Sequence, residues 1–438
     1  MSTTTAAAPR ASSRGYVLGL LTLVYAFNFI DRQILSTLGP AIKADLGISN
    51  GDFGLLTGIV FALFYTVLAI PVAGLADRFN RVVIVAAALV LWSGFTFASA
   101  FAGSFLVLAA LRVGVAIGEA GGSPPSHSIL SDLYPKAERG RALAIYSMGI
   151  PFGLMAAFFV AALLSSGQTT DWRLVLKVIG LPGIVVGFIL LLTVGEPQRG
   201  QLDQKAAGVP FREALPELLR IPSYWTMCLG ISFASFGGYA VSTFVVIYLR
   251  GAFPEVDLSR MLVMLGVING IFYAGGTYVG GALADRIAAR RGPGAYGWVA
   301  AASLLVVAPA IIAALYVESY AVCLTLFAIY IFFAGFYLGP SFSVAQNLAR
   351  PSVRATSTAV FFFVLNLIAL GGGPTVVGYL ADGFAGGRGE TAGLRLALTT
   401  LAVPYALAVL SYAMAARTLP RDMVRAEGAR PEGHLTPS

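Results

Sequence analysis

Two stretches of this chain end in the same four residues, Leu75-Ala76-Asp77-Arg78 and Leu283-Ala284-Asp285-Arg286. Each stretch closes a long apolar segment, and basic residues follow within a few positions of each. Counted along the chain, the two copies close the second and the eighth apolar segment. A repeat at matching positions indicates that the chain arose by duplication of a half that contains six such segments.

The composition places these segments in a lipid bilayer. The chain has 57% hydrophobic residues, 11% charged residues and a mean hydropathy of +0.80, whereas soluble domains are about 25% charged. A spanning helix needs roughly 20 mostly apolar residues. Stretches of this kind lie at about 16–38, 53–76, 82–101, 104–130, 140–165, 173–194, 222–249, 259–282, 295–316, 319–345, 355–380 and 393–416.

The sequence therefore predicts an all-α membrane protein with twelve transmembrane helices in two pseudo-symmetric six-helix bundles. A transmembrane β-barrel is excluded, because its ~10-residue segments alternate in polarity and stretches such as 82–91 are apolar throughout. The predicted parts are an N-terminal tail (1–15), an N-terminal bundle (16–194), a cytoplasmic linker (195–221), a C-terminal bundle (222–416) and a C-terminal tail (417–438).

The distribution of basic residues predicts how the chain lies in the membrane. Most lysines and arginines fall in the tails, the linker and the even-numbered gaps between segments. Because basic residues accumulate on the cytoplasmic side, both termini are expected in the cytoplasm. The net charge of +8 is then explained by this bias, and we expect no nucleic-acid partner. Residues 1–14 show no cleavage pattern, so we expect segment 16–38 to be retained.

Several kinds of chemistry have no support in the sequence. No phosphate-binding Gly-rich loop ending in Lys-Ser or Lys-Thr and no metal-ligand cluster is present, so we expect no cofactor and no use of ATP. Cys228 and Cys323 both lie in apolar segments and predict neither a disulfide nor a metal site. His127 has no acid spaced to orient it. We therefore do not expect an enzyme.

The repeated turns themselves are candidates for a conformational latch. An aspartate at the end of one helix can accept hydrogen bonds from the N-terminus of a neighbouring helix and can pair with arginine. The alternative is that these residues only set the topology of the chain. The predicted latch residues are Asp77, Arg78, Arg81, Asp285 and Arg286. A third, partial copy at 378–382 lacks the arginine, and we interpret it as chance or helix packing.

Charged residues within the apolar segments are the strongest functional signal. Each costs at least ~2.5 kcal/mol at the bilayer centre unless it faces a cavity or a partner. Asp31 and Arg32 lie in the first segment, and Arg112 and Glu119 lie seven residues apart on one face of the fourth. They are either a structural salt-bridge network or a functional site. In the functional reading Asp31 or Glu119 takes up a proton, and an arginine then binds an anionic group of the substrate bidentately.

The second half has no comparable charge within its segments. Its polar and aromatic residues predict an apolar wall for the remainder of a substrate, and buried amides require partners. Together with Asn28 in the first segment, the further predicted binding residues are Asn269, Tyr337 and Asn366.

These motifs resemble those of a known superfamily and, more narrowly, those of one of its branches. The turns at 74–81 and 281–286 resemble the signature loop of the major facilitator superfamily. The runs 28–32, 114–120 with Pro124-Pro125, and 131–142 look like its Spinster branch. That resemblance implies proton-linked or facilitated transport of amphipathic lipids such as lysophospholipids and sphingosine-1-phosphate, with roles for Asp31, Arg32, Arg112 and Glu119.

The sequence thus predicts a secondary active transporter that works by alternating access. We expect an amphipathic anionic or zwitterionic substrate of the lysophospholipid or sphingoid phosphate type, protons as the coupled ion, a monomer in the bilayer, and a bacterial inner (plasma) membrane location. The alternatives are a proton-coupled transporter of small organic anions, a lipid-modifying enzyme and a receptor that does not transport.

Overall fold

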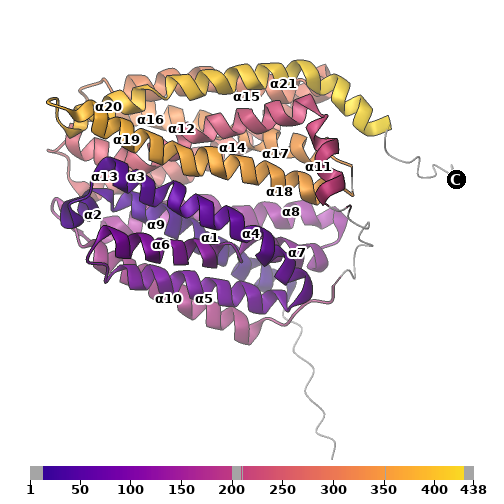
Figure 1. Cartoon of the computed structure of the whole chain (residues 1–438), viewed down its shortest axis with the longest axis horizontal. Coiled ribbons are helices and arrows are strands. Elements are labelled where there is room, and N and C mark those ends of the chain that lie inside the picture. Colours follow the sequence, from indigo (N-terminus) through magenta and orange to yellow (C-terminus); the bar gives the residue numbers. More distant parts are fainter. Residues whose placement is uncertain (1–12, 200–208, 210, 351, 429–438) are drawn as a thin grey trace, which may run out of the picture.

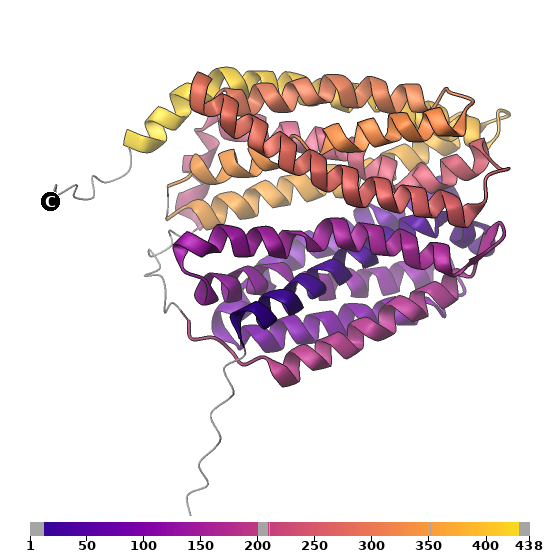
Figure 2. The same ribbon diagram turned by 180° about the vertical axis from the view of Figure 1, so that it is seen from behind.

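Two helical bundles lie side by side in the computed structural model, one above the other in Figure 1. The structure describes residues 13–199, 209, 211–350 and 352–428. Within these residues, twelve helices are long and apolar enough to cross a membrane. This confirms the predicted all-α fold with twelve spans. The view from behind shows the same separation of the first half from the second (Figure 2).

The first half contains helices and one short hairpin. Its elements are α1 (Arg14–Thr37), α2 (Gly39–Leu46), α3 (Asn50–Thr57), α4 (Ile59–Arg78), α5 (Arg81–Ser99), α6 (Phe105–Glu119), α7 (Ser123–Leu133), α8 (Lys136–Ser147), α9 (Gly149–Leu163), β1 (Ser165–Ser166), β2 (Thr169–Thr170) and α10 (Trp172–Thr193). The two strands are antiparallel, with Ser165 opposite Thr170.

The linker and the second half follow. Their elements are α11 (Phe211–Leu219), α12 (Pro222–Ala252), α13 (Leu258–Val267), the π-helix η1 (Ile268–Phe272), α14 (Tyr273–Arg291), α15 (Ala295–Ala314), α16 (Tyr320–Ala334), α17 (Leu338–Asn347), α18 (Arg354–Leu365), the π-helix η2 (Asn366–Gly372), α19 (Gly373–Ala385), α20 (Glu390–Thr399) and α21 (Ala402–Gly428).

The ends of several helices are fixed by side chains that accept backbone hydrogen bonds. Ser49 and Asp52 form a capping box at the start of α3, and Asp171 accepts from the N–H groups of Arg173 and Leu174 at the start of α10. Such caps satisfy donors that a helix leaves unpaired at its N-terminus. They begin helices at the end of the molecule that lies opposite the start of α1 and the end of α21.

The predicted segments agree with the helices but miss their true ends. The predicted segment 259–282 stops where charged residues begin, whereas α14 continues as a helix to Arg291. The last predicted segment, 393–416, likewise ends before α21 does. Polar residues at the ends of spanning helices lie outside the apolar layer without breaking the helix, so hydropathy alone underestimates helix length.

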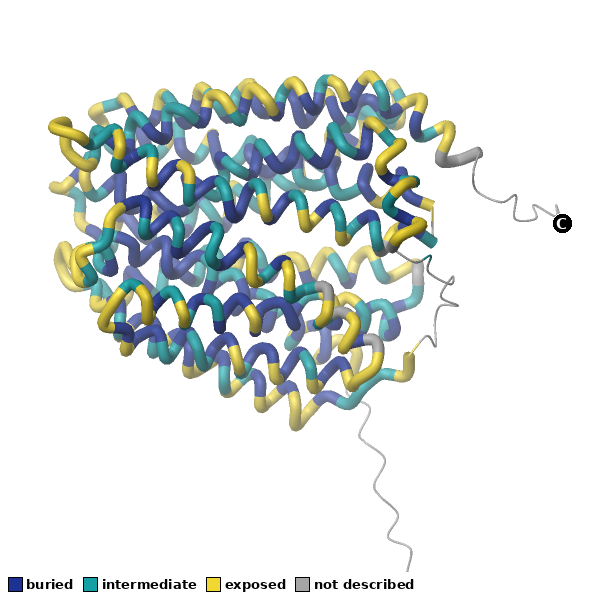
Figure 3. Tube along the Cα trace, in the orientation of Figure 1, coloured by how far each residue is buried: buried dark blue, intermediate teal, exposed yellow. Residues whose placement is uncertain are grey.

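Buried residues lie between the helices, and exposed ones follow the outer faces and the loops (Figure 3). The exposed residues include many large apolar side chains, among them Leu163, Leu192 and Tyr278. An apolar outer face of this kind is expected where lipid, rather than water, surrounds a bundle. The bilayer is therefore the natural surroundings of these faces.

The linker helix α11 is packed against the second half. Ala214 and Leu218 are fully buried, and the indole N–H of Trp225 donates to the carbonyl of Leu218. Glu217 accepts hydrogen bonds from Arg350 and raises the pKa of its guanidinium. The apolar side of α11 is therefore covered by protein.

Hydrogen bonds join the two halves at one end of the molecule. Among the described residues, these bonds gather at the end away from the start of α1 and the end of α21, where α3 and α19 pack together (Figure 1). Close approach there depends on Gly54, because a Cβ at this position would lie 2.3 Å from the carbonyl oxygen of Pro374. The molecule is therefore closed at this end.

An aspartate from the second half makes part of this contact. Asp382 accepts hydrogen bonds from the backbone N–H groups of Asn50 (3.0 Å) and Gly51 (2.7 Å) at the start of α3. Gly378, one turn earlier, packs on the backbone of Asn50. Helix packing at 378–382 is thus confirmed, but the interpretation is incomplete, since Asp382 also binds the N-terminus of a helix in the other half.

Candidate functional site

Four charged side chains gather inside the first half, on α1 and α6. Asp31 and Glu119 are each 1% exposed, and Arg112 is 4% exposed. The Nε of Arg32 donates to Oε2 of Glu119 at 2.8 Å. The sequence predicted that these residues share a site, and the structure brings them together; we call them the charge cluster.

Within the charge cluster, the direct ion pair joins Arg32 to Glu119 and does not include Asp31. Asp31 is not bonded to either arginine through its carboxylate; instead Oδ1 of Asp31 accepts from the hydroxyl of Thr96 at 2.7 Å. Arg112 reaches only the backbone carbonyl of Asp31, at 3.5 Å. Arg32 and Glu119 therefore form the direct ion pair, while Asp31 and Arg112 lie beside it.

The cluster is held by close contact between α5 and α6. A Cβ at Gly118 would lie 2.7 Å from the backbone nitrogen of Trp92, so only glycine allows this approach. The contact places Glu119 at the end of α6 close to the helix that carries Thr96. Thr96 was not identified from the sequence, since a threonine in an apolar segment gives no signal until its neighbour is known.

The charge cluster has unused hydrogen-bonding capacity. In the part of the chain that the structure describes, Oδ2 of Asp31, Oε1 of Glu119 and Nε of Arg112 are buried and have no hydrogen-bond partner. Buried polar atoms are nearly always paired, so unpaired ones require an explanation. A proton, a water molecule or a bound polar group would each satisfy them.

Aromatic rings surround the two arginines. The guanidinium carbon of Arg32 lies 4.4 Å from the ring centre of Tyr65, and that of Arg112 lies 4.9 Å from the ring centre of Phe61. Such cation–π contacts favour a charged group that has lost its water. Neither aromatic residue was predicted from the sequence, because both look like ordinary apolar residues of the second segment.

The other predicted binding residues are not all at this cluster. Asn28 is buried on α1, one helical turn before Arg32. Asn269 donates to the carbonyl of Leu265 within its own helix, and Tyr337 contacts Ser235 at 3.5 Å. From the second half, the side chain of Tyr239 lies close enough to Arg32 to interact with it electrostatically.

Asn269 and Asn366 share a feature that the sequence did not reveal. Each lies in a π-helical turn, Asn269 in η1 and Asn366 at the start of η2. Both turns face the first half, since η1 packs on α9 and η2 packs on α4. Interruptions of this type are frequent at functional sites.

Among the predicted latch residues, the bonds described for Arg81 and Asp285 stay on their own side of the boundary between the halves. Arg81 is buried and bonds Glu196 (2.7 Å) and Asp132 (2.5 Å), both outside the second half. Asp285 accepts from the hydroxyl of Tyr296, which belongs to the same half. Arg78 and Arg286 are exposed, and the side chain of Asp77 lies outside the described residues.

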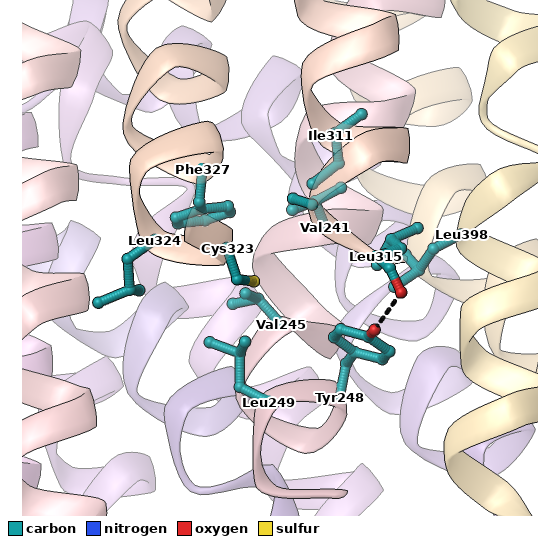
Figure 4. Close-up of a pocket in the computed structure, with 11 residues that line it drawn as sticks. Val241, Val245, Tyr248, Leu249, Ile311, Leu315, Cys323, Leu324, Phe327 and Leu398 are labelled. Atoms are coloured by element: carbon teal, nitrogen blue, oxygen red, sulfur yellow. Dashed lines mark hydrogen bonds between the residues drawn. The ribbon is translucent and has the colours of Figure 1, made fainter. Parts of the chain in front are cut away.

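A small apolar pocket elsewhere in the second half is separate from the charge cluster (Figure 4). It is lined by side chains of α12, α15 and α16 and contains Cys323. At its edge, the hydroxyl of Tyr248 donates to the carbonyl of Leu315 at 2.6 Å. With no charged residue in its lining, this pocket offers nothing that recognises a polar substrate.

Known proteins resemble the chain over nearly its whole length. The sequence profile of the major facilitator superfamily matches residues 21–374. The chain belongs to the major facilitator superfamily. It is 33% identical to an MFS-type efflux pump of Mycolicibacterium smegmatis, over 93% of this chain and 94% of that protein. This confirms that it is a membrane transporter and not an enzyme.

Within the superfamily, the similarity extends to the Spinster branch, as predicted. The chain is 30% identical to the mouse sphingosine-1-phosphate transporter SPNS2, over 53% of this chain and 43% of that protein. The crystal structure of a bacterial homologue of the human lysosomal transporter Spinster, in an inward-facing and occupied conformation, matches with a TM-score of 0.84. The two sequences are 32% identical, and the match covers 94% of this chain and 98% of the homologue.

Proposed function

We propose that this major facilitator protein moves an amphipathic lipid with an anionic or zwitterionic headgroup by alternating access, coupled to protons. The substrate class is that of a lysophospholipid or a sphingoid phosphate. The observation that carries the proposal is the charge cluster with its three unpaired polar atoms. Unpaired polar atoms on both acidic and basic side chains suit a site that alternately holds a proton and an anion.

The chemistry divides between acids and arginines. Arg112, whose Nε is unpaired, supplies a guanidinium that can bind a phosphate or carboxylate bidentately. Asp31 takes up the proton in this proposal, because the carboxylate of Glu119 is already paired with Arg32. Glu119 is the alternative proton site. The Asn28, Asn269, Tyr337 and Asn366 side chains complete the site as the halves rearrange.

The membrane orientation and the latch belong to the same proposal. With both termini in the cytoplasm, the closed end lies on the outer side, and the site is reached from the cytoplasm. Asp77, Arg78, Arg81, Asp285 and Arg286 would then join the halves in the opposite state, when the cytoplasmic end closes. The transporter acts as a monomer in the bacterial inner membrane.

A small organic anion is the second candidate substrate. Two arginines that lie on one aromatic ring can grip a carboxylate as well as a phosphate. Uptake of a labelled lysophospholipid into proteoliposomes separates the two. Excess unlabelled lysolipid is expected to abolish uptake, and excess of a short dicarboxylate is expected to leave it unchanged. Inhibition by the dicarboxylate alone would favour the second candidate.

A further inference from the structure

The ring of Phe61 contacts both arginines of the charge cluster. The guanidinium carbon of Arg112 lies 4.9 Å from the ring centre of Phe61, and that of Arg32 lies 5.4 Å from it. Phe61 is 1% exposed, so water does not screen these contacts. Its ring stacks on that of Tyr65, at 5.8 Å between centres and 13° between planes.

This arrangement answers an electrostatic problem within the charge cluster. Two guanidinium groups that share a buried site repel each other, and each has lost its hydration. Arg32 is compensated by Glu119, whereas the one hydrogen bond described for Arg112 is a long one, to the backbone carbonyl of Asp31. The negative face of an aromatic ring attracts cations without neutralising them. Phe61 can therefore stabilise Arg112 while leaving its charge available to an anion.

We propose that Phe61 is a positioning residue that holds Arg32 and Arg112 on one ring so that both can act on a single anionic headgroup. The inference rests on the proposed function, since it concerns the headgroup site. A carboxylate in place of the ring would hold the arginines more strongly, but it would also compete with the substrate anion. A ring avoids that competition.

The position of Phe61 also connects headgroup binding to movement between the halves. Its helix, α4, begins after a break at Gly58 and packs on η2 of the second half. Ile59 and Ala62, which flank this part of α4, both lie against Gly371 in η2. A displacement of η2 that moves α4 would therefore move the ring on which both arginines rest.

The test compares Phe61→Leu with Phe61→Tyr and with a matched packing control. Phe361→Leu is the control, because Phe361 is as buried as Phe61 and contacts other aromatic rings in the second half. Two readouts are needed: binding of dodecyl phosphate to the purified protein, and transport of a lysophospholipid and an uncharged monoacylglycerol in proteoliposomes.

Phe61→Leu is expected to weaken dodecyl phosphate binding by about tenfold, an effect of the size of a desolvated cation–π contact. Its KM for the lysophospholipid should rise similarly with a nearly unchanged maximal rate, and its handling of the uncharged lipid should not change. Phe61→Tyr should restore binding, because it keeps the ring.

The outcomes separate this inference from the proposed function. Equal losses in Phe61→Leu and Phe361→Leu, or no recovery in Phe61→Tyr, would overturn the positioning role. If the wild-type protein binds dodecyl phosphate but transports neither lipid, the proposed lipid function fails while the binding comparison still decides the role of Phe61. A wild-type protein that binds no dodecyl phosphate would overturn both.

Discussion

The two halves carry the same Leu-Ala-Asp-Arg stretch, within α4 and α14, but have different interiors. The first half buries two acids and one arginine on α1 and α6, with a second, partly exposed arginine beside them. The interior of the second half is held by hydroxyl pairs, such as Ser341 with Tyr412 at 2.8 Å and Tyr405 with Tyr330 at 3.3 Å. Duplication thus accounts for the scaffold, while the positions that differ between the halves determine what the site can bind.

The largest effect on stability is expected from breaking the buried ion pair of the first half. Glu119→Ala leaves the largely enclosed Arg32 without its ion-pair partner, which costs up to about 3–5 kcal/mol. Ser341→Ala removes one neutral hydroxyl from the interior of the second half and should cost about 1 kcal/mol. Thermal unfolding of the two variants in the same detergent measures the difference. Similar losses of stability in the two variants would mean that the ion pair contributes no more to stability than a neutral hydrogen bond.

The next effect concerns substrate affinity. Arg112→Ala is expected to weaken binding of a lysophospholipid by about 30-fold or more, because it removes a charged partner from a buried site. Arg112→Lys should recover only part of this loss, since lysine cannot bind an oxyanion bidentately. Equilibrium binding to the purified protein provides the measurement. An unchanged dissociation constant in Arg112→Ala would move the headgroup site away from the first half.

A third prediction concerns the contact between the halves. Asp382→Asn removes a charged acceptor for two N–H groups of α3 and should raise the fraction of molecules open at that end by about tenfold. Spin labels at Ala44→Cys and Gly386→Cys, both exposed at this end, report the distance between the halves.

The matched control for that experiment is Asp52→Asn. Asp52 caps the same helix but accepts hydrogen bonds only from Ser49, within its own half. A distance distribution that broadens equally in Asp52→Asn and Asp382→Asn would show that helix capping, rather than the contact between halves, controls closure.

The smallest effect is expected from the second half of the site. Tyr337→Phe removes a hydroxyl whose contact with Ser235 is long, at 3.5 Å, so affinity for the lysophospholipid should fall by less than about threefold. A loss as large as that of Arg112→Ala would contradict the division of roles between the halves. The same binding assay applies to both variants.

The sequence was sufficient for the parts of the structure that depend on local pattern. Apolar length predicted the spans, and the rarity of charge in a bilayer predicted that Asp31, Arg32, Arg112 and Glu119 share a site. The pairing of these charges depends on how far α1 lies from α6 and α5, which no spacing along the chain encodes. Thr96 and Phe61 were missed for that reason.

The role of the repeated aspartates was also beyond the sequence. Asp285 and Asp382 end nearly identical stretches, yet only Asp382 binds the other half in this structure. The difference arises because Asp382 lies at the end where described residues of the two halves pack together, and a transporter populates more than one conformational state. A motif that works in one state has no partner to reveal it in another.

The most direct test of the account is the pH dependence of transport in Asp31→Asn. Lysophospholipid transport by the wild-type protein in proteoliposomes should respond to an imposed proton gradient. Asp31→Asn, which fixes an uncharged side chain beside Thr96, should still bind the lipid but lose the response to the gradient. A variant that keeps the full response of the wild-type protein would contradict the assignment of Asp31 as the proton site.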